Sequence, residues 1–331
     1  MTDVPFSDVA PFAIGAAPLP AVDVGGLPII DVASLRGAND PRACVAELGK
    51  ACREIGFFYV TGHGISTDGI FAAAHEFFAL PVERKEQLSI KRSRHNRGYV
   101  GLGGERLDEQ TPPDQKEAFN IGLELAPDDP ELVAGKPFRG VNFWPDLIGW
   151  RATVLAYYEA CHRLVLDIHR GFALDLGIKE DFFVSRLDRP MSTLRLLHYP
   201  PGDSSDLGAG MHTDYGNLTV LATDGVAGLQ VRRRDGGWLD APHVAGAFVC
   251  NIGDCLMRWT NDVYVSTPHR VVRPKRERYS VAFFADPHPD AMVETIPSCL
   301  PAGVAPRYAP MSGAAYLASR LDATYDHRKQ V

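Results

Sequence analysis

The stretch Met211-His212-Thr213-Asp214-Tyr215 decides which fold we expect, because it sets two potential metal ligands two residues apart. On a β-strand, side chains at positions i and i+2 point to the same face. The imidazole of His212 and the carboxylate of Asp214 can therefore form two corners of one metal site. Two protein ligands hold a catalytic metal poorly, so we expect a third ligand elsewhere in the chain.

The best candidate for the third ligand is His269, which lies 55 residues after Asp214 (269 − 214) in the run STPHR. Two imidazoles and one carboxylate on one side of a metal leave positions open for substrate and dioxygen, an arrangement typical of non-haem Fe(II). With 11 His in the chain, a single H-x-D pair is a weak signal, and a surface His beside a turn Asp is the alternative. The same three side chains also bind zinc, so a zinc hydrolase is a rival interpretation.

A second pair of polar residues follows nine residues after His269, at Arg278 and Ser280 (278 − 269). These positions also share one strand face. The guanidinium of Arg278 is a rigid fork that binds a carboxylate bidentately, and the Ser280 hydroxyl lies beside it. A metal triad followed by this pair matches a 2-oxo diacid, which could chelate the metal at one end and be held by Arg278 at the other.

From residue 191 onward the pattern is typical of β structure, with short apolar runs separated by turns such as Asp235-Gly236-Gly237. Many short strands with such turns predict a sandwich or barrel. Because the metal ligands lie far apart in sequence, the fold must bring strand ends together, as a jelly roll does. We expect strands at residues 194–199, 218–223, 229–233, 238–241, 248–252, 264–272 and 279–285.

The first half of the chain alternates predicted helices with short strands. The longest predicted helix, 149–176, carries one apolar stripe, and His162 and His169 fall off it and are expected to face solvent. The glycine-rich segment 91–122 predicts a loop or hairpin over a pocket, and 123–147 a connecting loop. The other expected elements are strands at 27–31, 57–60 and 116–121, and helices at 41–55, 66–80 and 314–324.

The expected architecture is therefore α+β with a mainly β core, a double-stranded β-helix (jelly roll) with flanking helices. We expect a loose N-terminal arm at 1–26 and an N-terminal α/β region at 27–150. A helix-backed jelly-roll core with a C-terminal helix should occupy 151–331.

Composition narrows the classes of function. The net charge is −7, so no basic excess attracts a phosphate backbone, and nucleic-acid binding is not expected. No apolar run approaches the length of a membrane span, so a membrane role is not expected either. The six Cys show no CxxC and no framework spacing. We expect a reduced cytoplasmic protein without disulfides.

These residues together resemble the isopenicillin N synthase-like branch of the Fe(II)/2-oxoglutarate-dependent oxygenases, over roughly residues 27 to 325. The resemblance is specific because H-x-D, a distant His and R-x-S occur together in this order. The matching segments are LPIIDV and IGFFYVTGHGI near the start, then LRLLHYPP, HTDYGNLTVL, GLQV, VCNIGD, STPHRV and RYSVAFFADP.

The resemblance implies a jelly-roll core, iron ligation by His212, Asp214 and His269, and a 2-oxoglutarate clamp at Arg278 and Ser280. Tyr199 matches a tyrosine that also reaches the co-substrate. Many plant members have Asn-Tyr-Tyr where this chain has Leu197-His198-Tyr199.

The implied reaction is oxidation of a small organic molecule, most simply hydroxylation, with O2 as oxidant and release of succinate and CO2. Ascorbate is a possible reductant. The alternative within the family is an oxidative cyclase or ascorbate-dependent oxidase that uses O2 without 2-oxoglutarate.

Substrate contacts cannot be carried over from the resemblance, so we choose candidates by their segments. Some come from segments expected to cover the pocket, and others precede the third ligand. An Arg among them would favour an acidic substrate. The candidates are Arg97, Tyr99, Phe119, Asn120, Trp259 and Tyr264.

Overall fold

The computed structural model describes residues 22–37, 39–108, 111–203 and 207–324. A loose arm was predicted at 1–26, and residues 1–21 of it lie outside the described residues. Its last part is structured, in contrast to the prediction, because Val22–Val24 form strand β1 and pair antiparallel with β2, Leu27–Asp31.

Two sheets form the β core. The larger has the strand order β1-β2-β3-β11-β8-β13-β6-β5-β4, and the smaller has the order β10-β9-β12-β7. Side chains from both sheets share one buried cluster that includes Tyr59, Leu197, Val231 and Val271, so the sheets pack face to face. The further strands are β3 (Phe57–Thr61), β4 (Gly98–Val100), β5 (Glu117–Gly122), β6 (Thr193–Tyr199), β7 (Leu207–His212), β8 (Leu218–Thr223), β9 (Leu229–Arg232), β10 (Trp238–Asp240), β11 (Phe248–Ile252), β12 (His269–Val272), β13 (Arg278–Ala285), β14 (Met292–Val293) and β15 (Met311–Ser312).

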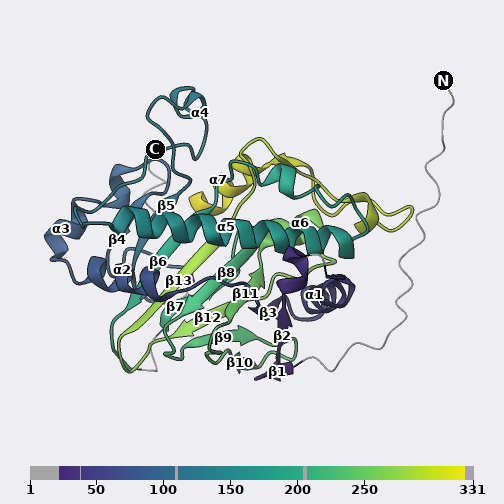
Figure 1. The fold of residues 1–331 in the computed structure, drawn as a ribbon, viewed down its shortest axis with the longest axis horizontal. Coiled ribbons are helices and arrows are strands. Elements are labelled where there is room, and N and C mark those ends of the chain that lie inside the picture. The colour runs from purple at the N-terminus through teal and green to yellow at the C-terminus, as the bar shows by residue number, and fades with distance from the viewer. Residues whose placement is uncertain (1–21, 38, 109–110, 204–206, 325–331) are drawn as a thin grey trace.

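Helices cover the outer face of the larger sheet. The long helix α5 lies across the strands, and α1 and α2 pack beside it (Figure 1). A large apolar cluster fills the space between these helices and the sheet. The α-helices are α1 (Arg42–Glu54), α2 (Asp68–Phe78), α3 (Val82–Glu86), α4 (Pro130–Val133), α5 (Trp150–Asp175), α6 (Asp254–Trp259) and α7 (Gly313–Thr324).

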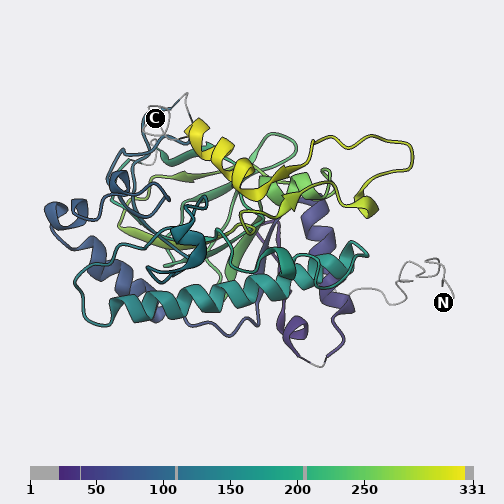
Figure 2. The same cartoon turned by 90° about the horizontal axis from the view of Figure 1, so that it is seen from above.

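The α7 helix lies apart from α5, as the view from above shows (Figure 2). The double-stranded β-helix core with flanking helices agrees with the predicted fold class, although the two sheets do not close into a barrel. The N-terminal strands β2 and β3 continue the same sheet as the core strands β11 and β8.

Two elements near the predicted metal ligands were not themselves predicted. The strand β7 has the sequence LGAGMH, and its glycines carry little of the β-branched or aromatic signal that marks strands. The helix α6 has only six residues, too few for a helical period to stand out. The strand predicted at 264–272 begins only at His269, because Pro268 lacks the N–H that a sheet would need.

The prediction that His162 and His169 face solvent is wrong for His169, which is fully buried, and His162 is itself half-buried. Its Nδ1 lies 2.8 Å from the carbonyl oxygen of Val165, and burial lowers its pKa to about 4. The ring packs edge-on against Phe172 and Phe183, so the buried face of α5 is wider than one apolar stripe.

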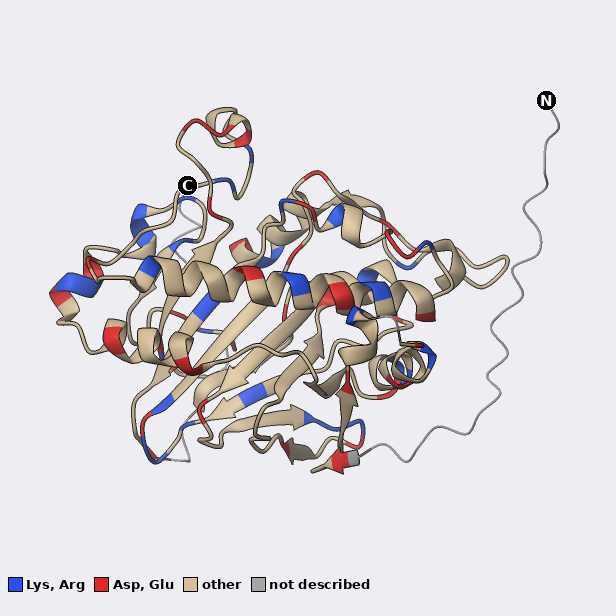
Figure 3. Ribbon diagram, viewed as in Figure 1, with Lys and Arg blue, Asp and Glu red and all other residues tan. Residues whose placement is uncertain are grey.

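Charged residues of both signs are interspersed along the helices and loops, and the central strands carry few (Figure 3). Among the described helices, none is long and apolar enough to cross a membrane. All six cysteines are free and buried.

Candidate active site

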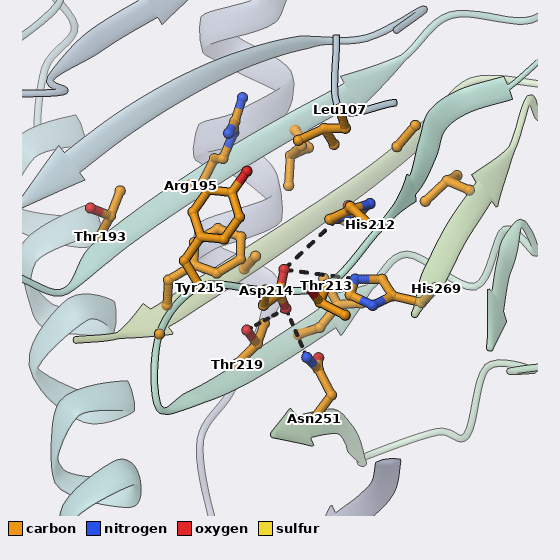
Figure 4. A pocket seen from close by; sticks show the side chains of 18 of the residues that line it. Leu107, Thr193, Arg195, His212, Thr213, Asp214, Tyr215, Thr219, Asn251 and His269 are labelled. Atoms are coloured by element: carbon orange, nitrogen blue, oxygen red, sulfur yellow. Dashed lines mark hydrogen bonds and ion pairs between the residues drawn. The ribbon is translucent and has the colours of Figure 1, made fainter. Parts of the chain in front are cut away.

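The three predicted metal ligands lie together (Figure 4), and they line a cavity whose walls come from both sheets. His212 ends β7, Asp214 follows it, and His269 begins β12. The Nε2 atoms of His212 and His269 lie 3.8 and 3.7 Å from Oδ1 of Asp214. One donor atom from each residue lies within 4.8 Å of the others, which is the spacing of ligands around a single ion.

The remaining polar atoms of these side chains are held by the protein. Nδ1 of His212 lies 2.7 Å from the carbonyl oxygen of Gly210, which leaves its Nε2 facing the centre. Oδ2 of Asp214 accepts hydrogen bonds from Thr219 (2.6 Å) and Asn251 (2.8 Å), which leaves Oδ1 facing the same point. Such contacts fix the tautomer and orientation of metal ligands.

The electrostatics of the three side chains also fit a divalent metal. Burial, and then the charge of His269, lower the pKa of His212 to about 3, so its ring is neutral. Burial alone would raise the pKa of Asp214. The two imidazoles and the hydrogen bonds from Thr219 and Asn251 outweigh burial, and the pKa lies below its ordinary value of 3.8. A neutral imidazole at His212 and an ionised carboxylate at Asp214 are donors that Fe(II) binds.

The predicted clamp residues line the same cavity. Arg278 and Ser280 are each 1% exposed, and Nη1 of Arg278 donates a 3.3 Å hydrogen bond to the Ser280 hydroxyl. Nε donates to the carbonyl oxygen of Val226 (3.2 Å), and the guanidinium lies 4.8 Å from the centre of the Tyr199 ring. A buried guanidinium held in this way, with no carboxylate of the described residues in ion-pair range, is suited to an anion entering the cavity.

Two family comparisons match most of the chain. Residues 27–147 match the N-terminal family described as non-haem dioxygenase in morphine synthesis, and residues 190–287 match the 2OG-Fe(II) oxygenase superfamily. A 2-oxoglutarate-Fe(II) type oxidoreductase of Emericella nidulans is 38% identical over 301 residues, which cover 86% of each chain.

This chain belongs to the 2-oxoglutarate-Fe(II) oxygenases.

Two further relatives show what such enzymes act on. A homoarginine-6-hydroxylase of Glycine max is 37% identical over 300 residues, covering 83% of this chain and 90% of that protein. The crystal structure of a full-length Neurospora crassa protein in complex with alpha-KG and thymine superposes with a TM-score of 0.79 at 31% identity, covering 91% of this chain and 98% of that one. The oxygenase is thus a 2-oxoglutarate-dependent enzyme of a family that oxidises small molecules.

Leu197 and His198, which replace the Asn-Tyr of many plant members, lie on opposite faces of β6. Leu197 lines the cavity beside Tyr199, as their spacing on the strand requires. His198 points to the opposite face, where its Nδ1 lies 2.7 Å from Glu117 and its Nε2 contacts Glu277. Of these two residues, only Leu197 is therefore in contact with the cavity.

Of the six predicted substrate residues, only Asn120 lines the cavity of the oxygenase. Tyr99, Phe119, Trp259 and Tyr264 lie in the apolar cluster under the helices. Arg97 is 2% exposed, and its guanidinium lies over Gly122, where an added Cβ would meet it at 1.8 Å. The strand β5 does reach the cavity, through Asn120. Strand alternation turns Phe119 on β5 and Tyr99 on β4 toward the helices instead.

Sequence reasoning did not select several other residues that line the cavity. Arg195 lies on β6, and Asp286 directly follows β13. Strand alternation from Arg278 and Ser280 would have placed Ala282 and Phe284 on the same face, but no motif marks the others. The additional lining residues include Asn96, Leu107, Thr193, Arg195, Tyr215, Phe284, Asp286, Leu317 and Leu321.

The α7 helix closes one side of the cavity with Leu317 and Leu321. Arg320 on the same helix forms a 2.9 Å ion pair with Asp254, and Asp254 accepts a 3.0 Å hydrogen bond from the Thr213 hydroxyl. The C-terminal helix is thereby joined to the segment that carries His212 and Asp214, two of the predicted metal ligands.

A second group of potential ligands, Glu131, His288 and Asp290, lies elsewhere on the oxygenase. Cations of the protein already pair with it, since Lys136 contacts both Glu131 (3.1 Å) and Asp290 (2.5 Å). Arg139 adds a 2.9 Å contact to Glu131. This group therefore joins loops rather than offering free ligands.

Proposed function

We propose that His212, Asp214 and His269 hold Fe(II) in this oxygenase, and that Arg278, Ser280 and Tyr199 bind 2-oxoglutarate. The reaction that we propose is hydroxylation of a small organic molecule, with release of succinate and CO2. The observation that supports it is the convergence of two Nε2 atoms and one Oδ1 on one point, while the protein occupies the other polar atoms.

The bound iron supplies the oxidative chemistry with O2, coupled to decarboxylation of 2-oxoglutarate. The protein's own residues bind and orient. Arg278 offers its remaining guanidinium donors to the distal carboxylate of the co-substrate, and Tyr199 packs against that guanidinium. The apolar side chains of Leu197, Leu229 and Val271 line the cavity and exclude water from it.

The test of the metal site is Fe(II) binding by His212→Ala, Asp214→Ala and His269→Ala. We expect each variant to lose iron at stoichiometric concentration while keeping its circular-dichroism spectrum. His243→Ala, which removes an exposed imidazole that does not line the cavity, is the control and should bind iron normally. Full iron occupancy in a triad variant would remove that residue from the site.

The rival reactions are separated by stoichiometry. One succinate per substrate oxidised supports 2-oxoglutarate use, whereas substrate loss without succinate would indicate a cyclase or an ascorbate-dependent oxidase. A weak visible charge-transfer band with Fe(II) and 2-oxoglutarate under anaerobic conditions supports an oxygenase, and a zinc hydrolase would give none. Ascorbate is proposed only as a reductant that keeps the iron ferrous.

We also propose that the enzyme works in the cytoplasm on a small-molecule substrate. Six buried cysteines without a disulfide fit a reducing compartment. Fractionation of the native cells followed by immunodetection tests this location.

A further inference from the structure

The carboxyl group of Asp286 is a buried acid that the proposed chemistry does not use. Asp286 directly follows β13, lines the cavity and is 5% exposed. Its backbone is fixed, since its N–H donates to the Ser192 hydroxyl (3.1 Å) and its carbonyl oxygen accepts from that hydroxyl (3.4 Å). No hydrogen bond or ion pair from the described residues reaches its side-chain oxygens, although buried polar groups are almost always paired.

The position of this carboxyl group relates it to the reaction centre. A Cβ on Gly216 would lie 3.1 Å from Oδ1 of Asp286, so the group lies against the turn that directly follows Asp214. Burial, and then the negative charge of Asp214, raise the pKa of Asp286 to about 8, and Arg97 opposes the shift. A cation bound against this carboxyl group favours its ionised form and lowers the pKa, so the group ionises as the cation binds. A group placed here would contact a molecule held beside the metal.

The other charged groups that line the cavity already have partners. Lys116 pairs with Asp114 at 2.5 Å, and both Lys116 and Arg195 pair with Glu105, at 3.5 and 2.5 Å. The triad and Arg278 are assigned to the metal and to 2-oxoglutarate. Within the described part of the chain, Asp286 is the lining carboxyl group without an ion pair.

Arg97 is not an ion-pair partner of Asp286. Its guanidinium is fully buried outside the cavity lining, and no ion pair joins it to Asp286. Burial lowers its pKa to about 10. It moderates the charge of Asp286 from a distance and leaves the carboxylate oxygens open to a ligand.

We propose that Asp286 is a substrate-recognition residue, and that it binds a cationic nitrogen of the substrate, an ammonium or guanidinium group. The inference rests on the proposed function, since it places the substrate beside the proposed iron. The acceptor oxygen of Asn120, a buried side chain that lines the same cavity, also has no hydrogen-bond partner among the described residues and would accept from such a group. The substrate class is thus opposite in charge to the acidic substrate that an Arg in the pocket would favour.

The experiment measures binding of small ligands to the anaerobic enzyme loaded with Fe(II) and 2-oxoglutarate. The panel pairs ammonium and guanidinium compounds with uncharged analogues, such as n-pentylguanidine with n-pentylurea and n-pentylamine with 1-pentanol, and includes small dicarboxylic acids. Calorimetry gives the affinities, and the shift of the visible band reports binding near the metal. We expect at least one cation to bind ten times more tightly than its uncharged analogue.

The variant Asp286→Asn keeps the shape of the side chain and removes its charge. It should lower the affinity for the preferred cation at least tenfold. The affinities for the uncharged analogue and for 2-oxoglutarate should change less than twofold. Asp286→Glu keeps the charge and should retain the preference for the cation. Asp290→Asn, the same change at an exposed position four residues away, should bind like the wild type.

The two proposals fail in different ways. Absence of the visible band in the wild type before any ligand is added would overturn the proposed function. Three results, each with a normal band, would overturn only the inference about Asp286. They are that no cation binds, that a dicarboxylic acid binds more tightly than the cations, and that the cation binds equally well to the wild type and to Asp286→Asn. If Asp286→Asn fails to fold, the wild-type preference and the Asp286→Glu variant decide it.

Discussion

Thr219 donates a 2.6 Å hydrogen bond to Oδ2 of Asp214 from the neighbouring strand β8. We expect Thr219→Val to weaken Fe(II) binding by about 10–100-fold, because the carboxylate loses a group that orients it. Thr219→Ser keeps the hydroxyl and should bind nearly as the wild type. An anaerobic Fe(II) titration measures this, and wild-type affinity in Thr219→Val would show that Asn251 alone orients the carboxylate.

Arg278→Ala should weaken 2-oxoglutarate binding by about 2–5 kcal/mol, since a buried carboxylate loses its charged partner. Arg278→Lys should recover only part of this, because an ammonium group cannot bind a carboxylate through two parallel bonds. Calorimetry on the Fe(II)-loaded enzyme measures both. Arg270→Ala on β12, outside the cavity lining, is the control, and unchanged affinity in Arg278→Ala would remove Arg278 from the clamp.

The α7 side chains should act on the substrate and not on the co-substrate. Leu317 and Leu321 line the cavity and are 8% and 5% exposed, so the double change to Ala opens this wall. We expect the KM for substrate to rise by the equivalent of about 1–3 kcal/mol, with the KM for 2-oxoglutarate unchanged. Steady-state kinetics measure the two constants separately. Val304→Ala at an exposed position is the control, and an equal rise in both constants would point to a general loss of folding.

His198 should make the stability of the fold depend on pH. Burial alone would lower its pKa, but its contacts with Glu117 and Glu277 raise it above the ordinary 6.5. Burial likewise tends to raise the pKa of Glu117, but His198, Lys85 and Tyr99 bring it below 4.5. The His198 contribution is therefore complete below pH 6.5 and is lost as the pH rises through the folded pKa. The Glu117 contribution is present above pH 4.5 and is lost as the pH falls.

We therefore expect His198→Gln to cost about 1–2 kcal/mol near pH 6, where a charged hydrogen bond is lost. The difference from the wild type should shrink as the pH rises. Urea unfolding at a series of pH values measures it, with His243→Gln as the control. A difference that is constant with pH would mean that His198 has the same pKa in the folded and the unfolded protein.

The convergence of His212, Asp214 and His269 could be predicted from local motifs, and their role as metal ligands stays a prediction. His212 and Asp214 lie two residues apart, and the His269 and Arg278 motifs each stand in a run of strand residues. The fold class followed from the many short strands and their turns. The boundary drawn at residue 150 stays a prediction, since β2 to β5 share one sheet with the core strands.

The rest of the cavity wall could not be predicted in the same way. Arg195, Asp286 and Leu321 come from separate segments, and only the pairing of β6 with β13 and the docking of α7 bring them together. Tyr264 was misplaced because Pro268 delays the strand to His269, which leaves Tyr264 in a buried loop with its hydroxyl 2.6 Å from Asp175.

His269 and His212 are directly opposite each other in the antiparallel pairing of β12 with β7. A slip of one residue between these strands would turn His269 to the other face and separate it from Asp214. With iron held as proposed, a polypeptide retains it only after this pairing has formed in the right register. Iron content per chain would then report, without any substrate, what fraction of a refolded or heat-stressed preparation has assembled its smaller sheet correctly.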